Sequence, residues 1–143
     1  MQWFYEELTF KTRSQTVHLM TDFLTDNLPW LETIDLGLLN LFLQHTSASL
    51  SINENCDPDV RTDLMMSLDQ IAPENMPYKH KDEGADDMPA HVKSSLLGVS
   101  INIPIRNGAL NLGRWQGIYL CEHRRMPHER KIVCTANGIV NSR

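Results

Sequence analysis

Apolar residues along the chain fall into short runs and brief alternations, the pattern typical of β-strands. The clearest run covers residues 36–43 and is almost entirely apolar, which predicts a strand covered on both faces. A buried helix is the alternative, but Gly37 and the polar stretch after Leu43 favour a strand. Further strands are predicted at residues 3–10, 17–20, 49–53, 99–105, 118–122 and 131–135.

Helical spacing is clearest after Asp57. Its carboxylate can accept amide hydrogens at a helix start, and Pro58 suits the first helical position. Apolar residues then recur three or four positions apart as far as Ile71, and Pro73 ends the segment. These features predict a helix between Asp57 and Pro73.

Two shorter helices are predicted on either side of it. Residues 21–28 form the first, with Thr21 as a candidate cap. The second begins near Pro89 and ends at Gly98, and the acidic pair just before it is favourably placed at the positive end of its dipole. The polar loop that precedes it, residues 73–88, is long for a connection inside one domain, which indicates a functional segment.

These elements show no regular β-α-β repeat, which predicts an α+β fold. A length of 143 residues, with 41% hydrophobic and 22% charged residues, fits one globular domain over residues 1–143. We expect a compact domain with a mainly antiparallel sheet core and two to three helices. An Asn-Gly pair at residues 107–108 predicts a tight turn between strands.

Charge and cysteine content narrow the partners and the compartment. The formal net charge is −5, so the chain repels a phosphate backbone and nucleic acid is not an expected partner. No apolar run approaches the roughly 20 residues that a membrane span needs, and acids stand where a signal peptide has basic residues. Three cysteines without a C-x-x-C pair suit a reducing environment. We therefore expect a cytoplasmic protein.

Three of the six histidines lie in unusual polar clusters. His45 directly follows the apolar strand, His80 lies in the polar loop, and His91 lies near the start of the next helix. Three neutral imidazoles suit zinc and leave a fourth position open for water or substrate. Spacings of 35 and 11 residues match no local zinc motif, so three unrelated polar histidines are the alternative. The neighbouring acids, which could orient the rings, are Glu83, Asp86 and Asp87.

Two other segments combine residues that could bind a substrate. Asn53-Glu54-Asn55 could hold substrate hydroxyls or a metal-bound water, although a turn before a helix is the alternative. Trp115-Gln116-Gly117 could offer a stacking surface with a polar group beside it, or form a tight turn around one packed aromatic ring.

Basic residues gather after the predicted strand 118–122. Arg124 lies nearest the strand and is the candidate to bind a phosphate or carboxylate. For Arg125, Arg130 and Lys131 a solvated hairpin tip is the preferred interpretation.

Taken together, these segments resemble the YjbQ family, the secondary thiamine-phosphate synthase family. The resemblance covers most of the chain, in order, and as a set its motifs are highly specific. It is carried by Gln44-His45-Thr46-Ser47-Ala48, Asn53-Glu54-Asn55, Asp57-Pro58-Asp59-Val60-Arg61, His80, residues 83–98, Leu112-Gly113, Trp115-Gln116-Gly117-Ile118 and Glu122.

The resemblance implies a homotrimer and a divalent metal, usually zinc, held by the histidines at 45, 80 and 91. It also implies that the Asn-Glu-Asn and Trp-Gln-Gly segments lie near the same site. The sequence departs from the family pattern at Arg114, where many members have Thr, and at His123, where many have Phe.

The implied activity is a weak thiamine-phosphate synthesis, which joins a pyrimidine diphosphate to a thiazole phosphate and releases pyrophosphate. Glu83 or Asp87 would act as base or orient a ligand, Arg124 would meet the anion, and Trp115 would stack on a ring. Metal-assisted hydrolysis of a phosphate ester suits the same residues. The alternatives are a non-catalytic trimer that binds a metal or metabolite, and a metal that only staples the fold.

Overall fold

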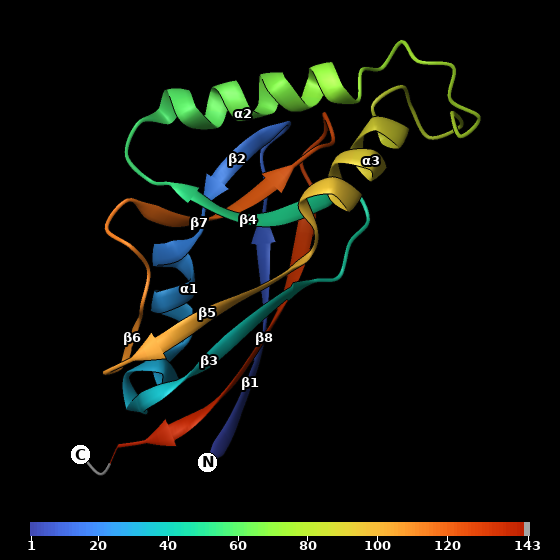
Figure 1. Ribbon diagram of the computed structural model, residues 1–143. Helices are drawn as coiled ribbons and strands as arrows, with labels where there is room; N and C mark the ends of the chain where they lie inside the picture. Colours follow the sequence, from blue (N-terminus) through green and yellow to red (C-terminus); the bar gives the residue numbers. More distant parts are fainter. Residues whose placement is uncertain (142–143) are drawn as a thin grey trace.

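Two antiparallel β-sheets form the body of the protein (Figure 1). The computed structural model describes residues 1–141. The larger sheet has the strand order β1 (Gln2–Lys11), β8 (Glu129–Val140), β3 (Ile34–Leu43), β5 (Ser100–Arg106) and β6 (Ala109–Leu110). The smaller sheet has the order β2 (Thr16–Leu19), β7 (Gln116–Glu122) and β4 (Ala48–Glu54).

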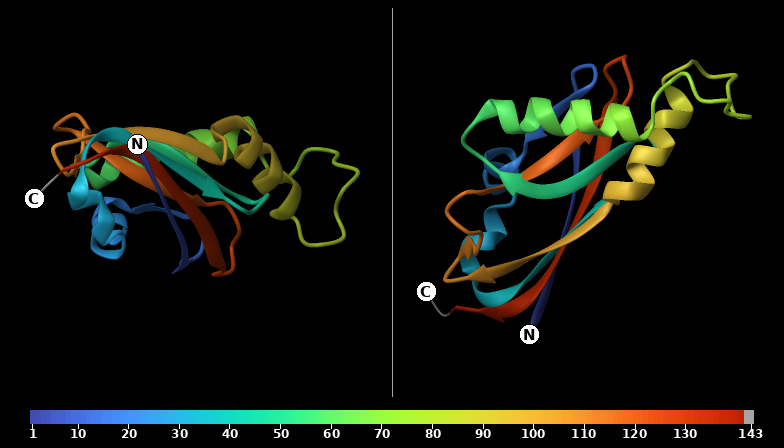
Figure 2. Two further views of the ribbon diagram at one scale, coloured as in Figure 1. Left: turned by 90° about the horizontal axis from the view of Figure 1, so that it is seen from below. Right: turned by 45° about the horizontal axis from the view of Figure 1, so that its top comes forward.

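Helices cover the smaller sheet and one end of the larger one. Helix α2 (Pro58–Ile71) lies over β2, and α3 (Asp87–Leu97) packs against β4. Helix α1 (Thr21–Asn27) continues into a short 3-10 turn, η1 (Pro29–Thr33), that leads into β3. The loop between α2 and α3 projects beyond the sheets in every view (Figure 2). Among residues 1–141, no helix has the length and apolarity needed to cross a lipid bilayer.

The main core lies on the inner face of the larger sheet. Alternate residues of β3 and β5 point into it, because successive side chains of a strand face opposite sides. They pack with apolar residues of β4, β7, β8 and α1. Fully buried members include Leu39, Leu41, Leu43, Leu50, Ile103, Ile105, Ile118, Leu120 and Ile132.

The predicted α+β class and each predicted strand and helix are confirmed, and two local signals act as expected. The Asp57 carboxylate accepts a hydrogen bond from the Asp59 amide at 2.9 Å and caps α2. Asn107 and Gly108 both have positive φ, 51° and 76°, at the turn between β5 and β6. Asn and Gly adopt this region at least cost, so the pair fits a tight hairpin turn.

The prediction that β3 is covered on both faces is wrong for the single chain. Leu36, Leu38 and Phe42 are 59%, 48% and 43% exposed. They lie on the outer face of the larger sheet, where the pleat carries every second residue away from the core. The nearly continuous apolar run therefore reflects one buried face and one apolar face that no part of residues 1–141 covers.

Two other expectations are corrected. Thr21 does not cap α1, because its hydroxyl accepts a hydrogen bond from the Ile118 amide at 3.0 Å instead. The segment after β7 is not a hairpin tip, since β7 and β8 belong to different sheets. Arg130 is accordingly buried, and its guanidinium pairs with the buried carboxylate of Glu122.

Candidate metal centre

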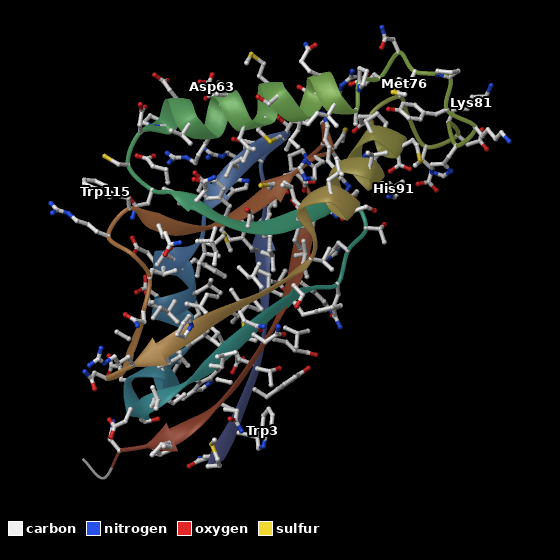
Figure 3. The ribbon with its side chains drawn as sticks, viewed as in Figure 1. Trp3, Asp63, Met76, Lys81, His91 and Trp115 are labelled. Carbon is white, nitrogen blue, oxygen red and sulfur yellow. The ribbon has the colours of Figure 1, made fainter. Side chains whose placement is uncertain are left out.

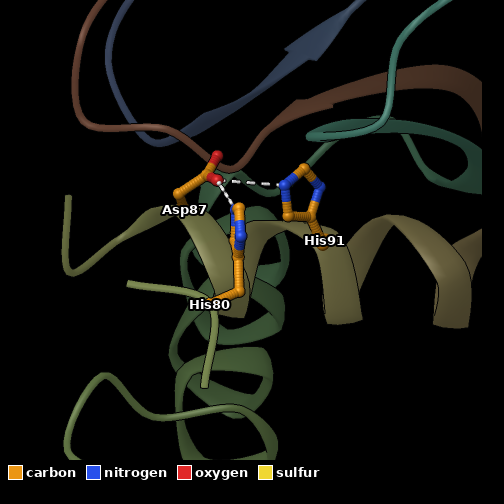
Figure 4. Close-up of side chains that lie close together, drawn as sticks. All are labelled: His80, Asp87 and His91. Carbon is orange, nitrogen blue, oxygen red and sulfur yellow. Dashed lines mark hydrogen bonds and ion pairs between the residues drawn. The ribbon is translucent and has the colours of Figure 1, made fainter. Parts of the chain in front are cut away.

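The start of α3 and the loop before it bring three side chains together. Asp87 and His91 lie four residues apart on α3, so they share one face of the helix. His80, in the loop, folds back toward the same face (Figure 4). The Nε2 atoms of His80 and His91 lie 2.7 and 3.0 Å from the same oxygen, Asp87 Oδ2. Their donor atoms all lie within 4.8 Å of one another.

The orientation of the His91 ring is fixed by the backbone. Its Nδ1 lies 2.7 Å from the Thr46 carbonyl oxygen, which can only accept, so Nδ1 carries the hydrogen. In a neutral ring Nε2 then holds a lone pair, and this lone pair faces the Asp87 carboxylate. Two acceptors so close require a positive charge between them, either a second ring proton or a metal ion. A backbone carbonyl on the far nitrogen is a common feature of histidines that bind metals.

The Asp87 carboxylate is held between cationic and hydrogen-bonding groups. Its side chain is only 2% exposed, and Oδ1 lies 2.9 Å from Nη1 of Arg124. Burial alone would raise the pKa of Asp87. The hydrogen bond from His80 and the charges of His91 and Arg124 outweigh burial and lower it. Asp87 therefore presents a charged oxygen, Oδ2, to both histidines.

Each nitrogen of Arg124 has a partner in this arrangement. Nε lies 2.9 Å from Asp86 Oδ2, Nη1 pairs with Asp87, and Nη2 donates to the Glu83 carbonyl at 3.0 Å. Arg124 therefore positions Asp87, and its predicted contact with a substrate anion stays a prediction. The Glu83 side chain is exposed on the loop.

His45 lies near His91 but outside this cluster. Both line one pocket of about 440 Å³, together with Ser94, Ser95 and Val99. The Lys131 amide donates to His45 Nε2 at 2.7 Å, so in a neutral ring the hydrogen sits on Nδ1. The chain therefore assembles two of the three predicted histidines with Asp87, and His45 remains a neighbour whose lone pair is already used.

The other predicted binding segments lie elsewhere. Figure 3 places Trp115 and His91 at opposite ends of the smaller sheet. Asn55 donates to the carbonyls of Arg114 and Gln116, and the Glu54 carboxylate accepts the Cys56 and Asp57 amides. Asn53 Oδ1 accepts the Glu54 amide, and Gly117 is buried beneath Asn55. Within one chain these residues form two turns that lie away from the histidines. Asn55 and Gln116 also line a separate pocket of about 230 Å³.

Comparisons with known proteins agree with the resemblance read from the motifs. The family model described as "UPF0047 protein YjbQ-like" matches residues 6–139. The chain belongs to the YjbQ (UPF0047) family. It is 50% identical over 136 residues to the UPF0047 protein YjbQ of Salmonella typhimurium, covering 95% of this chain and 99% of that protein. A relative of the same name from Escherichia coli O157:H7 is 46% identical over the same shares.

Solved structures of YjbQ-family proteins have the same fold. A crystal structure of an uncharacterised YjbQ/UPF0047 protein from Clostridium acetobutylicum superposes with a TM-score of 0.80 at 37% identity. It covers 90% of this chain and 97% of that one. A YbjQ-like protein of unknown function from Sulfolobus solfataricus has a TM-score of 0.85 at 23% identity, over 96% and 99% of the two chains, which supports the fold alone.

The cluster has a donor set that fits a divalent metal. Two imidazole nitrogens and a carboxylate oxygen are ligands that zinc accepts readily. The contacts that organise the cluster were invisible in the sequence. Nothing local links the Thr46 carbonyl to His91 or the Lys131 amide to His45, because each pair meets only through the fold.

Proposed function

We propose that this protein is a metal-dependent enzyme that acts on a small phosphorylated metabolite. One observation carries the proposal: two histidine nitrogens converge on a single buried carboxylate oxygen of Asp87. Such convergence concentrates negative and lone-pair density at one point, which a divalent cation would stabilise.

His80 and His91 would hold the metal, which we expect to be zinc, and Asp87 Oδ2 lies where it can complete the set. Bound there, the metal would supply Lewis-acid polarisation of a phosphoryl oxygen. Arg124 would keep Asp87 charged and in place through Oδ1. The Thr46 carbonyl would hold the His91 ring with Nε2 toward the metal. The prediction that His45 is a third ligand requires its ring to release the Lys131 amide.

Two pockets flank the cluster and could receive the substrate. One contains His45 and His91, and the other, of about 380 Å³, contains His80, Lys81 and Gly84. Lys81 brings a cation to the second pocket, whereas Arg124 pairs with Asp86 and Asp87. The exposed Glu83 is our candidate for the general base, since its loop borders that pocket.

The reaction could be transfer or hydrolysis. Thiamine-phosphate synthesis is the transfer that the family resemblance suggests, with pyrophosphate as the leaving group. Hydrolysis of a phosphate monoester needs the same metal and base but only water as the second reactant. The two are separated by adding the thiazole phosphate acceptor to the pyrimidine diphosphate and identifying the products. Transfer gives thiamine phosphate and pyrophosphate, whereas hydrolysis of a phosphate ester gives inorganic phosphate.

A metabolite- or metal-binding trimer without catalysis is the second candidate. The uncovered apolar face of the larger sheet favours assembly, because patches of this kind usually mark protein contacts. We propose that three copies of the chain assemble through this face. In that assembly, segments that lie apart within one chain could meet across subunits.

The test is metal content by mass spectrometry on tag-free protein, with His45→Ala, His80→Ala and His91→Ala beside the wild type. We expect about one metal per chain, lost in His80→Ala and His91→Ala with the fold intact. His128→Ala, which removes a histidine outside the cluster, should keep the metal.

Turnover of phosphate esters that disappears with the metal would support the enzyme. Protein that takes up no zinc would exclude the metal mechanism, and metal without any turnover would favour the binding protein.

A further inference from the structure

A second polar pocket lies between α2 and the segment around β2, and none of its lining residues belongs to the metal centre. Helix α2 crosses β2 here (Figure 1). The pocket has a volume of about 310 Å³, within the range of small-molecule sites. Its lining combines two arginines, polar side chains and an apolar wall: Arg13, Gln15, Thr16, Val17, Pro58, Arg61, Thr62 and Met65.

Arg61 carries an unsatisfied donor. Its Nη1 atom is buried and has no hydrogen-bond partner among residues 1–141. Buried guanidinium nitrogens without an acceptor are unfavourable, and native proteins rarely leave them so. The Arg61 side chain also contacts the Tyr119 hydroxyl, which carries no negative charge. Since Arg61 lines the pocket, an anion bound there would lie beside this guanidinium.

Arg13 adds a second positive charge to the same pocket. Within residues 1–141, neither Arg13 nor Arg61 forms an ion pair. By contrast, Arg124, Arg125 and Arg130 each pair with a carboxylate. In a chain with an excess of acids, two arginines that share a pocket without a carboxylate leave an uncompensated local charge.

The rest of the lining narrows the class of anion. The hydroxyl group of Thr16 can donate to an additional oxygen, whereas Thr62 Oγ1 already donates to the Pro58 carbonyl at 3.3 Å. Two guanidinium groups with a flanking hydroxyl suit the three oxygens of a phosphate dianion. Val17, Pro58 and Met65 provide an apolar wall for a small organic group attached to it.

We propose that this pocket binds a phosphate dianion between Arg13 and Arg61, either as the free ion or as a small monoester. The site is independent of the metal centre, because no residue lines both. It would give the protein a second place for a phosphorylated ligand, at which neither histidine of the cluster takes part.

Isothermal titration of the full-length protein with inorganic phosphate tests the proposal, at an ionic strength held constant with sodium chloride. We expect saturable binding that weakens by at least about tenfold in Arg13→Gln and in Arg61→Gln, since a charged hydrogen bond is worth at least a factor of that size. Arg13 is exposed, so its variant should fold even where Arg61→Gln does not.

Methyl and propyl phosphate, titrated in parallel, distinguish the two ligand sources. Tighter binding of the monoesters assigns the pocket to an organic phosphate, and equal or weaker binding assigns it to the free ion.

Two matched variants separate this site from others. Arg106→Gln removes an exposed arginine on β5, outside the pocket, and should leave phosphate affinity unchanged. In His91→Ala, which disables the proposed metal centre, the phosphate binding that depends on Arg13 should persist. No saturable binding in the wild type, or equal binding in wild type and Arg13→Gln, would overturn the proposal. Binding lost only in His91→Ala would move the phosphate to the metal centre.

Discussion

At the scale of single residues, Asp87 is the side chain on which the candidate site depends. One oxygen faces two histidines and the other faces Arg124, while the side chain is almost fully buried. Burial of a carboxylate is unfavourable unless it is paired and hydrogen-bonded, and here Arg124 and a positive charge at the two histidines fulfil that requirement. The acid therefore has the position and charge that a metal ligand, or the partner of one, requires.

Asp87→Asn should weaken zinc binding by about 10- to 100-fold, the usual effect of losing a group that orients or completes a metal site. The amide keeps the shape but removes the charge that faces His80 and His91. Competition with a chromophoric chelator measures the affinity. Asp82→Asn, which removes an equal charge from an exposed position in the loop before α3, serves as the control. Equal affinity in both variants would show that Asp87 is not part of the site.

His123 is a buried residue whose charge state links stability to pH. It is fully buried directly after β7, and Nε2 lies 2.9 Å from the Ser49 hydroxyl oxygen. Burial, reinforced by the nearby charge of Lys93, lowers the pKa of His123 from 6.5 to about 4. Its Nδ1 has no hydrogen-bond partner among residues 1–141. The folded protein thus holds this ring neutral where an unfolded chain would protonate it.

The sign of the pH effect follows from that difference. Between about pH 6.5 and pH 4 the unfolded chain binds one more proton at this site, so the free energy of unfolding falls as the pH falls. The full loss is on the order of 3 kcal/mol. His123→Phe removes the titration, so we expect its unfolding free energy to depend less steeply on pH over this window. Urea titrations at several pH values measure both curves. Parallel curves for wild type and variant would contradict the assignment.

The sequence could predict His80, Asp87 and His91 as candidate site residues because they lie close together along the chain. Asp87 and His91 are neighbours on one helix, and His80 is only seven residues from Asp87. The contacts made over long sequence distances could not be read in advance. The sequence predicted that Arg124 binds an anion but could not predict that its guanidinium group contacts Asp86, Asp87 and the Glu83 carbonyl.

At the scale of elements, turn and cap chemistry predicted the helices well because it is local. Asp57, Pro58 and Gly98 act within one turn of their own position. Strand environment is not local. The apolar run of β3 showed that a strand exists, but its neighbours in the fold decide which face is covered. The environment of the segment after β7 is not local either. Its sequence is polar and predicted an exposed hairpin tip, but the chain passes to the other sheet here and Arg130 is buried.

Asp57→Ala should lower the free energy of unfolding by about 1 kcal/mol, the usual cost of losing a helix N-cap. The lost interaction is the 2.9 Å hydrogen bond from the Asp59 amide. Chemical denaturation monitored by circular dichroism measures the difference. Asp63→Ala removes an exposed acid from the middle of the same helix and should change stability by less than about half of that. A cap variant as stable as Asp63→Ala would show that the bond contributes nothing measurable.

At the scale of the whole molecule, the outer face of the larger sheet is the feature that a single chain leaves unexplained. Large apolar side chains stand exposed on three of its strands: Trp3 and Tyr5 on β1, Leu36, Leu38 and Phe42 on β3, and Ile139 on β8. β8 lies between β1 and β3. A hollow of about 290 Å³ lies among them, lined by Trp3, Leu38, Asn40, Thr135 and Asn137. Exposing this much apolar surface to water is unfavourable, and a second copy of the chain would cover it.

Leu38→Glu should therefore dissociate the proposed trimer, because it would place a carboxylate in a surface that association removes from water. Light scattering on a sizing column gives the mass, with one chain at 16.4 kDa and the wild type expected at three times that value. Ile71→Glu places the same charge on an exposed apolar residue at the end of α2, away from the sheet face, and should remain trimeric. A wild type that already runs as a monomer would exclude assembly through this face. A trimer that survives Leu38→Glu would place the subunit contact on a different surface, and the apolar face of β3 would then need another partner.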